Sequence, residues 1–394
     1  MKILFVTPRL PLPADTGAKI RTYNLLKNTA KNNHVSLLSF YHEEDDKAVN
    51  DLKRIGIDVH LVKANDKIRM SKILGHLPVS IEKYSSEEMR GRLKELLSNE
   101  KFDIIHFDHL HMGQYRGAVN GLPCILDEHN VESVILERCA SIEKSLIKKL
   151  LFKSQSKKMA RFEGNIVSKF TKCLTVSEDD KKNLLKMSEN KAEVEVISNG
   201  VDTEYFNLST MTYELKEENS LVFTGSMDWL PNSDAVIYFV KEILPLIWKK
   251  NNQVKFYIVG KNPSKEVLSL GNKDNRIIIT GVVDDVRPYI AKSKIFVVPL
   301  RVGGGTRLKI LEAMAMGKAI VSTTIAAEGI KYTDGYNIII QDYPLHIANS
   351  ILALLEDEQK RKNLGQAGRE LACNCYDWKI ISQKLNNIYK TIAS

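Results

Sequence analysis

The sequence predicts an α/β protein of two doubly wound domains that face each other across a cleft. Two observations carry this prediction. Short β-branched or apolar runs alternate with longer helical patterns, and this rhythm stops at a polar, turn-rich stretch and then starts again. The length of 394 residues also exceeds what one ordinary hydrophobic core supports.

The first half of the chain contains seven strand-like runs. They read KILFVT, HVSLLSFY, IDVHLV, FDIIHF, LPCILDE, CLTVS and VEVIS. Helices are predicted from about Gly17 to Asn32, near residues 85–99, and over a long segment before CLTVS. Apolar strands separated by helices are typical of a buried parallel sheet.

The stretch SNGVDTEYFNLSTMT is rich in turn residues and then polar, which indicates a linker. The rhythm restarts with SLVFTG and continues with VKFYIVG, RIIITG, KIFVVPL, KAIVS and NIIIQ. Further helices are expected at about Asn232 to Lys249, at 285–292, and in three final segments, the last around Trp378 to Ala393. We therefore predict domains over residues 1–204 and 205–376, with a helical segment at 377–394. Because open parallel sheets bind ligands at the carboxyl ends of their strands, the predicted site is the cleft between the domains.

Bulk composition excludes several classes of protein. Hydrophobic residues make up 43% and aromatic residues 7% of the chain, which are values of a globular rather than a disordered protein. The start, MKILFVTPRL, lacks the apolar core of a secretory signal, and no run reaches the ~18 uncharged residues of a membrane span. The five cysteines fit no zinc pattern. We expect a protein of the reducing cytoplasm, soluble or peripheral to a membrane.

The segment VPLRVGGGTRLKILEAMAMGKAIVS holds the main candidate site. It predicts a strand end, a turn made by Gly303 to Gly305 with Thr306, and a helix. Free amides at a helix N-terminus bind anions, whereas Arg307 and Lys309 oppose the helix dipole unless an anion compensates. A diphosphate that accepts hydrogen bonds from the amides and both cations would do so. The alternative is that both cations point into solvent and the glycines form an ordinary turn.

Glu312 lies one turn beyond Lys309 and is the candidate ligand of a ribose, because a carboxylate accepts hydrogen bonds from both hydroxyls of a diol. It could instead form an ion pair with Lys309. No GxGxxG follows the first strand, MAMGKAI is not a P-loop, and the chain has no DxD pair to hold a cation. Dehydrogenase and kinase functions are therefore disfavoured, and a site with no metal and no cofactor is predicted.

With these motifs the chain resembles the retaining, nucleotide-sugar-dependent glycosyltransferases of the GT-B type, in particular family four. The resemblance runs over nearly the whole length. It rests on VISNGVDTEYF, IIITGVVDDVRPYIAKSKIFVVPL, KILEAMAMGKAIVST and the YDW before the last helix. It implies two Rossmann-like domains that close on a donor, with the nucleotide held by the second domain and the acceptor by the first. The last helix is expected to cross back to the first domain.

By this resemblance, Glu312 matches the second Glu of the family's E-x7-E signature, whereas the first Glu falls at Gly304 and is absent. The family's diphosphate-binding Arg and Lys follow the strand that ends in FTG, where this chain reads GSMDWLPN. We infer that Arg307 and Lys309 supply the missing charge from a different loop.

The resemblance also assigns residues at other strand ends. Gly17 of ADTGAKIR matches a glycine loop whose amides face the donor phosphates, and His129 of LDEHNVES matches a histidine placed against the donor sugar. The alternative for His129 is a structural role. Gly281 and Val282 follow RIIIT, where the family's backbone contacts the base. A plain strand-to-helix turn capped by Asp284 is the alternative there.

The cluster HFDHLHM contains His106, His109 and His111, which suggests a metal site. Their spacing matches no known ligand set, so a place on the acceptor side of the cleft is favoured.

Residues 141–172 carry nine basic and two acidic residues, a net charge of +7. Apolar residues at helical spacing in this segment are Ile147, Leu151, Phe162, Ile166 and Phe170. The segment either packs this stripe into the core or rests on anionic lipid at a membrane. Nucleic acid is disfavoured as a partner, because exposed aromatic residues are not interleaved with the cations.

The sequence thus predicts a retaining hexosyltransferase of the cytoplasm or the cytoplasmic membrane face. It would move a sugar from a nucleoside-diphosphate sugar to a hydroxyl of a glycan or lipid-linked acceptor in surface polysaccharide or glycoconjugate synthesis. The resemblance implies front-face transfer, with Arg307 and Lys309 holding the leaving diphosphate. The alternatives are a GT-B epimerase or phosphorylase acting on activated sugars, and a sugar-nucleotide-binding protein without turnover, for which Gly304 is the argument.

Overall fold

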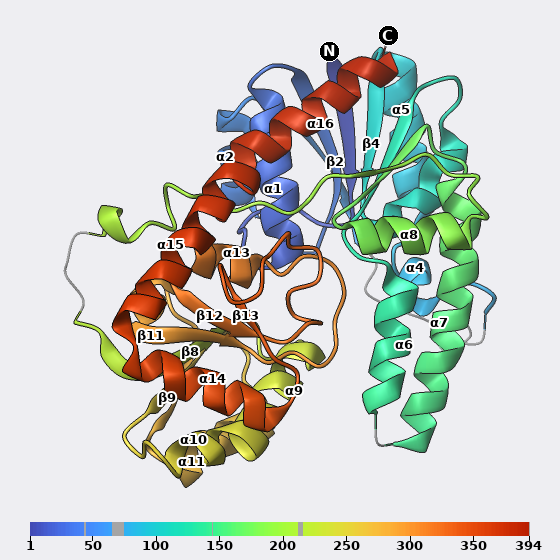
Figure 1. Cartoon of the computed structure of the whole chain (residues 1–394). Coiled ribbons are helices and arrows are strands. Elements are labelled where there is room, and N and C mark those ends of the chain that lie inside the picture. Colours follow the sequence, from blue (N-terminus) through green and yellow to red (C-terminus); the bar gives the residue numbers. More distant parts are fainter. Residues whose placement is uncertain (43–44, 65–74, 144, 212–215, 394) are drawn as a thin grey trace. The chain divides into compact units, whose positions relative to one another are not determined.

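The computed structural model describes residues 1–42, 45–64, 75–143, 145–211 and 216–393, which fold into two compact α/β units (Figure 1). The first unit comprises Met1–Ser198 and Trp378–Ser394, and the second comprises Asn199–Asp377. The sequence analysis places the first boundary after residue 204. Residues 199–204 lie with the second unit because the Val201 amide donates to the Tyr376 carbonyl at 2.7 Å and the Thr203 hydroxyl donates to Asp377.

The first unit is built on a sheet of seven parallel strands in the order β3-β2-β1-β4-β5-β6-β7. The strands are β1 (Lys2–Thr7), β2 (His34–Tyr41), β3 (Ile57–Lys63), β4 (Ile104–Asp108), β5 (Cys124–Glu128), β6 (Lys172–Thr175) and β7 (Val194–Val196). The strand order reverses between β1 and β4. Loops that follow these two strands therefore flank the topological switch point, where doubly wound sheets bind ligands.

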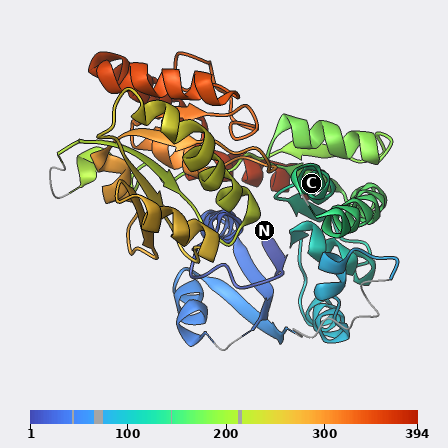
Figure 2. The ribbon, with the colours of Figure 1, turned by 90° about the horizontal axis from the view of Figure 1, so that it is seen from below.

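Helices cover both faces of this sheet (Figures 1 and 2). They are α1 (Gly17–Ala30), α2 (Asp46–Arg54), α4 (Val79–Lys83), α5 (Glu87–Asn99), the 3-10 helix η1 (Leu110–Ala118), α6 (Glu132–Ile142), α7 (Leu146–Val167), α8 (Glu178–Met187) and the C-terminal α16 (Trp378–Ala393). The last helix packs against α1. Its Tyr389 is fully buried, and the Tyr389 hydroxyl hydrogen-bonds His106 Nδ1 at 2.8 Å.

The second unit has a six-stranded parallel sheet in the order β10-β9-β8-β11-β12-β13. The strands are β8 (Glu218–Thr224), β9 (Lys255–Val259), β10 (Ile277–Gly281), β11 (Ser293–Val298), β12 (Ala319–Ser322) and β13 (Ile339–Ile340). Here the order reverses between β8 and β11, so the loops after these strands form the corresponding switch point.

The helices of the second unit follow its strands in the same alternating pattern. They are η2 (Leu208–Thr210), α9 (Leu230–Tyr238), the π-helix η3 (Phe239–Ile243), α10 (Leu244–Trp248), α11 (Lys265–Lys273), α12 (Arg287–Lys292), α13 (Leu308–Ala315), α14 (Pro344–Glu356) and α15 (Glu358–Cys375). The single helix expected at 232–249 is thus α9, a π turn and α10 in succession. In the described part of the chain, every helix is too short or too polar to traverse a lipid bilayer.

Candidate active site

The loop between β11 and α13 brings the glycines and Arg307 into contact. Gly303 and Gly305 have φ angles of 149° and 68°, which side-chain-bearing residues rarely adopt. Arg307 is the N-cap of α13, and its guanidinium folds back so closely that a Cβ atom at Gly303 would overlap it. Thr306 is buried, and its carbonyl accepts a hydrogen bond from Asn199 Nδ2 at 3.0 Å. Arg307 therefore lies on the glycine turn.

Lys309 extends from the first turn of α13 to the carboxyl end of β8. Its Nζ donates to Asn232 Oδ1 at 2.8 Å and lies 3.9 Å from the centre of the Phe223 ring. A Cβ atom at Gly225 would lie 2.7 Å from the same Nζ. The ammonium therefore occupies the loop after FTG, which is where the family resemblance expects the missing Arg and Lys.

Burial shifts the pKa values of Lys309 and Glu312 towards each other. Burial and the neighbouring charge of Arg307 lower the pKa of Lys309 to about 7, although Glu312 opposes this shift. Burial raises the pKa of Glu312 to about 7, although Lys309 opposes it. The ion pair that the sequence allowed does not form, since Lys309 points to Asn232. An anion bound beside Lys309 would stabilise its charged form.

The predicted base contacts lie at the end of β10. Gly281 has a φ of 68°, and Val282 is strongly exposed. The alternative that Asp284 caps the following helix is wrong. Val286 is the N-cap of α12 and makes no side-chain capping bond. Asp285 accepts a hydrogen bond from the backbone amide of Arg287 at 2.9 Å and pairs with the Arg287 guanidinium.

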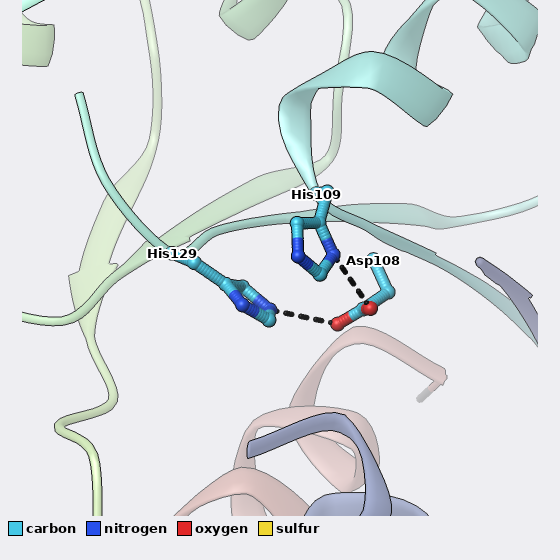
Figure 3. Close-up of side chains that lie close together, drawn as sticks. All are labelled: Asp108, His109 and His129. Atoms are coloured by element: carbon cyan, nitrogen blue, oxygen red, sulfur yellow. Dashed lines mark hydrogen bonds and ion pairs between the residues drawn. The ribbon is translucent and has the colours of Figure 1, made fainter. Parts of the chain in front are cut away.

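In the first unit, His129 belongs to a buried triad with Asp108 and His109 (Figure 3). His129 Nε2 lies 2.9 Å from Asp108 Oδ1, and His109 Nδ1 lies 2.8 Å from Asp108 Oδ2. The two imidazole centres are 3.7 Å apart. Burial alone would raise the pKa of Asp108, but His129 and His109 hold it well below its usual range. The ionised carboxylate only accepts hydrogen bonds, so both facing ring nitrogens carry hydrogen.

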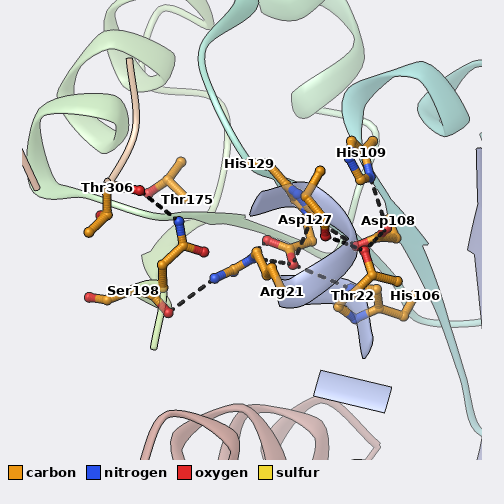
Figure 4. A network of polar contacts seen from close by, with 12 residues as sticks. Arg21, Thr22, His106, Asp108, His109, Asp127, His129, Thr175, Ser198 and Thr306 are labelled. Carbon is orange, nitrogen blue, oxygen red and sulfur yellow. Dashed lines mark hydrogen bonds and ion pairs between the residues drawn. The ribbon is translucent and has the colours of Figure 1, made fainter. Parts of the chain in front are cut away.

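A second network holds this triad in place (Figure 4). The Thr22 hydroxyl donates to Asp108 Oδ2 at 2.8 Å. Arg21 donates to both oxygens of Asp127, at 3.0 and 2.8 Å, and its Nη1 donates to the Ser198 carbonyl at 3.0 Å. Burial would raise the pKa of Asp127, but the Arg21 guanidinium holds it low. Sequence reasoning missed Arg21 and did not single out Asp108, although Asp108 lies within the quoted HFDHLHM.

The three histidines of that cluster do not form one site. Two groups of possible metal ligands come together instead, Asp108 with His109 and His129, and His106 with Asp108 and Asp127, each within 4.8 Å. The oxygens of Asp108 already accept hydrogen bonds, so a cation there would have to replace them. His111 joins neither group among the described residues. Burial lowers the pKa of His111 to about 3.

Gly17 is the first residue of α1, at the switch point of the first sheet. Its N-cap, Thr16, makes no side-chain capping bond, and the first turn holds no acidic residue. The helix therefore offers amide groups to an anion.

Two family models match the chain, one in each unit. "Glycosyltransferase Family 4" matches residues 16–205, and "Glycosyl transferases group 1" matches residues 218–357. An uncharacterized 44.6 kDa protein in the cps region of Klebsiella pneumoniae is 24% identical over 89% of this chain and 90% of its own length. The UDP-Gal:alpha-D-GlcNAc-diphosphoundecaprenol alpha-1,3-galactosyltransferase of Escherichia coli is 26% identical over 68% of this chain and 70% of its own.

Solved structures show the same fold over the whole chain. The Anabaena protein HepE, in complex with UDP and glucose, superposes with a TM-score of 0.73 at 16% identity, covering 99% of this chain and all of HepE. The sucrose-phosphate synthase of Thermosynechococcus elongatus gives a TM-score of 0.72 at 15% identity, covering 100% and 99%. The solved structures thus show that the two α/β units have the GT-B fold. Since the two family matches also span both units, the protein is a GT4-like glycosyltransferase with this fold.

Proposed function

We propose that this enzyme transfers a hexose, with retention of its anomeric configuration, from a nucleoside-diphosphate sugar to a hydroxyl of a glycan or lipid-linked acceptor. The pathway would be surface polysaccharide or glycoconjugate synthesis. The observation that carries the proposal is the hydrogen bond from Lys309 to Asn232. It puts a cation at the carboxyl end of β8, at the switch point of the second sheet, where nucleotides bind in doubly wound folds.

In this scheme the second unit binds the donor. The backbone amides of Gly303–Thr306, Arg307 and Lys309 hold the diphosphate, because charge-assisted hydrogen bonds to phosphate are strong and directional. Glu312 accepts hydrogen bonds from the ribose hydroxyls, and the backbone of Gly281 and Val282 contacts the base. Gly304 stands where the family signature has its first Glu, so other groups would have to make the donor contact of that Glu.

The chemistry follows from the charge that develops on the leaving group. The bond between the anomeric carbon and the phosphate oxygen breaks, and the acceptor oxygen bonds to that carbon on the same face. The acceptor proton passes to the departing diphosphate, so no protein nucleophile is used. Arg307, Lys309 and the amides stabilise the diphosphate as its charge grows, which is the type of contact whose single loss costs ~2.7 to 4 kcal/mol in the barrier.

The first unit contributes His129 and Gly17 and binds the acceptor. Asp108 fixes the ring of His129, which suits a residue that must meet a sugar hydroxyl in one orientation. The E. coli relative acts on a diphosphoundecaprenol-linked sugar, which favours a lipid-linked acceptor here. A peripheral membrane contact through residues 141–172 would then bring the enzyme to its substrate.

We propose that the reaction needs no metal ion, since two cations and the helix amides already neutralise a diphosphate. Activity should persist after dialysis against a chelator. A loss that only added Mg²⁺ or Mn²⁺ restores would contradict this part of the proposal.

The function is tested in two steps. Melting curves with UDP-, GDP-, ADP-, CDP- and dTDP-sugars identify the donor, because a ligand at 100 times its dissociation constant stabilises by ~2.7 kcal/mol. The donor is then incubated with polyprenyl diphosphate-linked saccharides, and the anomeric configuration of the product is read by NMR. Release of nucleotide that needs an acceptor supports transfer. Conversion without an acceptor would indicate an epimerase, consumption of donor by phosphate a phosphorylase, and binding without turnover a degenerate protein.

A further inference from the structure

We propose that the free end of the α6/α7 hairpin inserts apolar side chains into an anionic lipid bilayer. This inference rests on the proposed lipid-linked acceptor for its purpose, but its evidence is independent. The two helices lie side by side and antiparallel (Figures 1 and 2). We call the exposed residues at the start of α7 the α7 tip: Leu146, Ile147, Leu150 and Leu151.

The apolar stripe that the sequence shows in this segment divides into two parts. Ile166 and Phe170 are buried in the core of the first unit, as a structural stripe would be. The α7 tip is not. Its four side chains are 77%, 82%, 68% and 50% exposed in chain order. The core-facing role therefore accounts only for the C-terminal part of α7, and the tip needs another explanation.

The α7 tip faces away from the neighbouring helix. At about 100° per residue, its four positions cover about 140° of the circumference. Ser156, Met159 and Glu163 form the buried face on the opposite side, and the Ser156 hydroxyl donates to the Ser133 carbonyl of α6 at 3.0 Å. The tip could pack against α6 only if α7 rotated about its own axis, which would remove the residues of its buried face from the core.

Lysines lie on both sides of the α7 tip. On the helical projection, Lys149 and Lys153 lie beside Leu146, and Lys148 lies beyond Leu151. None of the three pairs with a carboxylate among the described residues. The first turn of α7 also has no acidic residue, and Ser145 makes no side-chain capping bond, so the helix dipole adds positive potential.

This combination favours lipid over a protein partner. An interfacial helix places its apolar face below the lipid headgroups while lysines at its margins contact the phosphates. A protein interface of the same size would bury the lysines against the apolar core, and interface cores are depleted in lysine. The membrane affinity of an interfacial helix grows with the apolar area that it buries and with the attraction of its cations to anionic lipids. The α7 tip and its lysines provide both contributions.

The test is binding of the full chain to phosphatidylcholine vesicles with and without phosphatidylglycerol, measured by co-sedimentation without donor or acceptor. We expect the quadruple variant Leu146→Ser, Ile147→Ser, Leu150→Ser and Leu151→Ser to bind the anionic vesicles at least ~10-fold more weakly. The triple variant Lys148→Gln, Lys149→Gln and Lys153→Gln should lose the preference for phosphatidylglycerol. Leu268→Ser with Leu345→Ser, two exposed leucines of the second unit, is the matched control and should bind normally.

Insertion is distinguished from surface contact by a Leu150→Trp variant and brominated lipids. The brominated lipids should quench the tryptophan fluorescence of this variant more strongly than that of the parent protein. Equal quenching of the two proteins would overturn the proposal. Unchanged vesicle binding by the quadruple variant would also overturn it. A variant that changes the oligomeric state of the protein but not its lipid binding would overturn it too, because the α7 tip would then be a contact between copies of the chain. The vesicle measurements need no turnover. A negative vesicle result would therefore not argue against sugar transfer, and a negative transfer assay would not argue against lipid binding.

Discussion

At the scale of single residues, α13 carries the charged groups of the proposed donor site. Lys309 and Glu312 lie one turn apart on this helix, and burial brings the pKa of each to about 7. Burial therefore makes the charged form of each group costly, and a bound nucleotide that contacts both groups would offset this cost. Arg307 precedes them against the glycine turn. Perturbed titratable groups of this kind concentrate at functional sites.

Arg307→Ala tests the diphosphate contact. We expect it to abolish the melting-temperature shift caused by the donor nucleotide and to lower kcat by about 10² to 10³, the effect of losing one transition-state contact. Arg301→Ala is the matched control, because Arg301 lies in the same loop and pairs with Asp234 at the surface. A variant of Arg307 that keeps the parent shift would remove this residue from the site.

Glu312→Gln tests the pH dependence of stability. The folded-state pKa of Glu312 is raised from 4.5 to about 7, so its contribution is present below pH 4.5 and is lost as the pH rises to 7. Between these values the parent should lose roughly 2 to 3 kcal/mol relative to Glu312→Gln, measured as the free energy of unfolding of the second unit. A difference that stays constant with pH would show that burial does not perturb this carboxyl.

At the scale of elements, close backbone contacts fix α13. The helix ends at Ala315, with Met316 as its C-cap. Gly317 follows with a φ of 63°, and its amide donates to the Met314 carbonyl at 2.8 Å. A Cβ atom at Gly365 of α15 would overlap the Gly317 carbonyl oxygen. The glycine thus lets α15 approach the end of α13, and this contact sets where Lys309 and Glu312 lie.

Gly365→Ala should therefore destabilise the second unit by roughly 1 to 3 kcal/mol, because the backbone opposite it cannot yield cheaply. Gly91→Ala is the control. Gly91 also lies inside a helix, α5, but a Cβ atom there meets nothing within 4 Å, so a gain of about 0.5 to 1 kcal/mol is expected from the better helix former. Thermal unfolding of both variants checks the pair. Equal effects would mean that the close approach of α15 is not needed.

At the scale of the whole molecule, the chain returns to its first unit at the end. Residues 378–394 belong with residues 1–198, although they follow the second unit in sequence. Trp378, Ile381, Leu385 and Tyr389 are buried in this packing. The stability of the first unit therefore depends on a helix at the C-terminal end of the chain.

Leu385→Ala should destabilise the first unit by about 2 to 5 kcal/mol, the usual loss for a buried leucine. Hydrogen exchange should show lower protection in β1 and β4 and unchanged protection in β8 and β11. The neighbouring substitution Lys384→Ala, at an exposed position of the same helix, should change neither. Protection that falls in the second unit would contradict the assignment of α16.

The comparison of sequence and structure differs between elements. The last helix is observed over Trp378–Ala393 as predicted, and each predicted strand is present. Helix α2 was not expected, because it has only nine residues and most of them are polar or charged. The pattern also does not reveal the π turn within the helix predicted at 232–249. Strands of a buried sheet are predicted well, since most of them contain a short run of consecutive apolar residues.

The sequence by itself determined the two parallel sheets, their alternation with helices and the glycine turn before α13, because these depend on local periodicity and on the conformational freedom of glycine. Only the tertiary structure decided which side chains meet. It brought Lys309 to Asn232 across 77 positions, joined His129 to Asp108 and His109, and left the α7 tip exposed. The physical reason is that one helical pattern fits a buried or an exposed face equally well, and only the packing of distant segments selects between them.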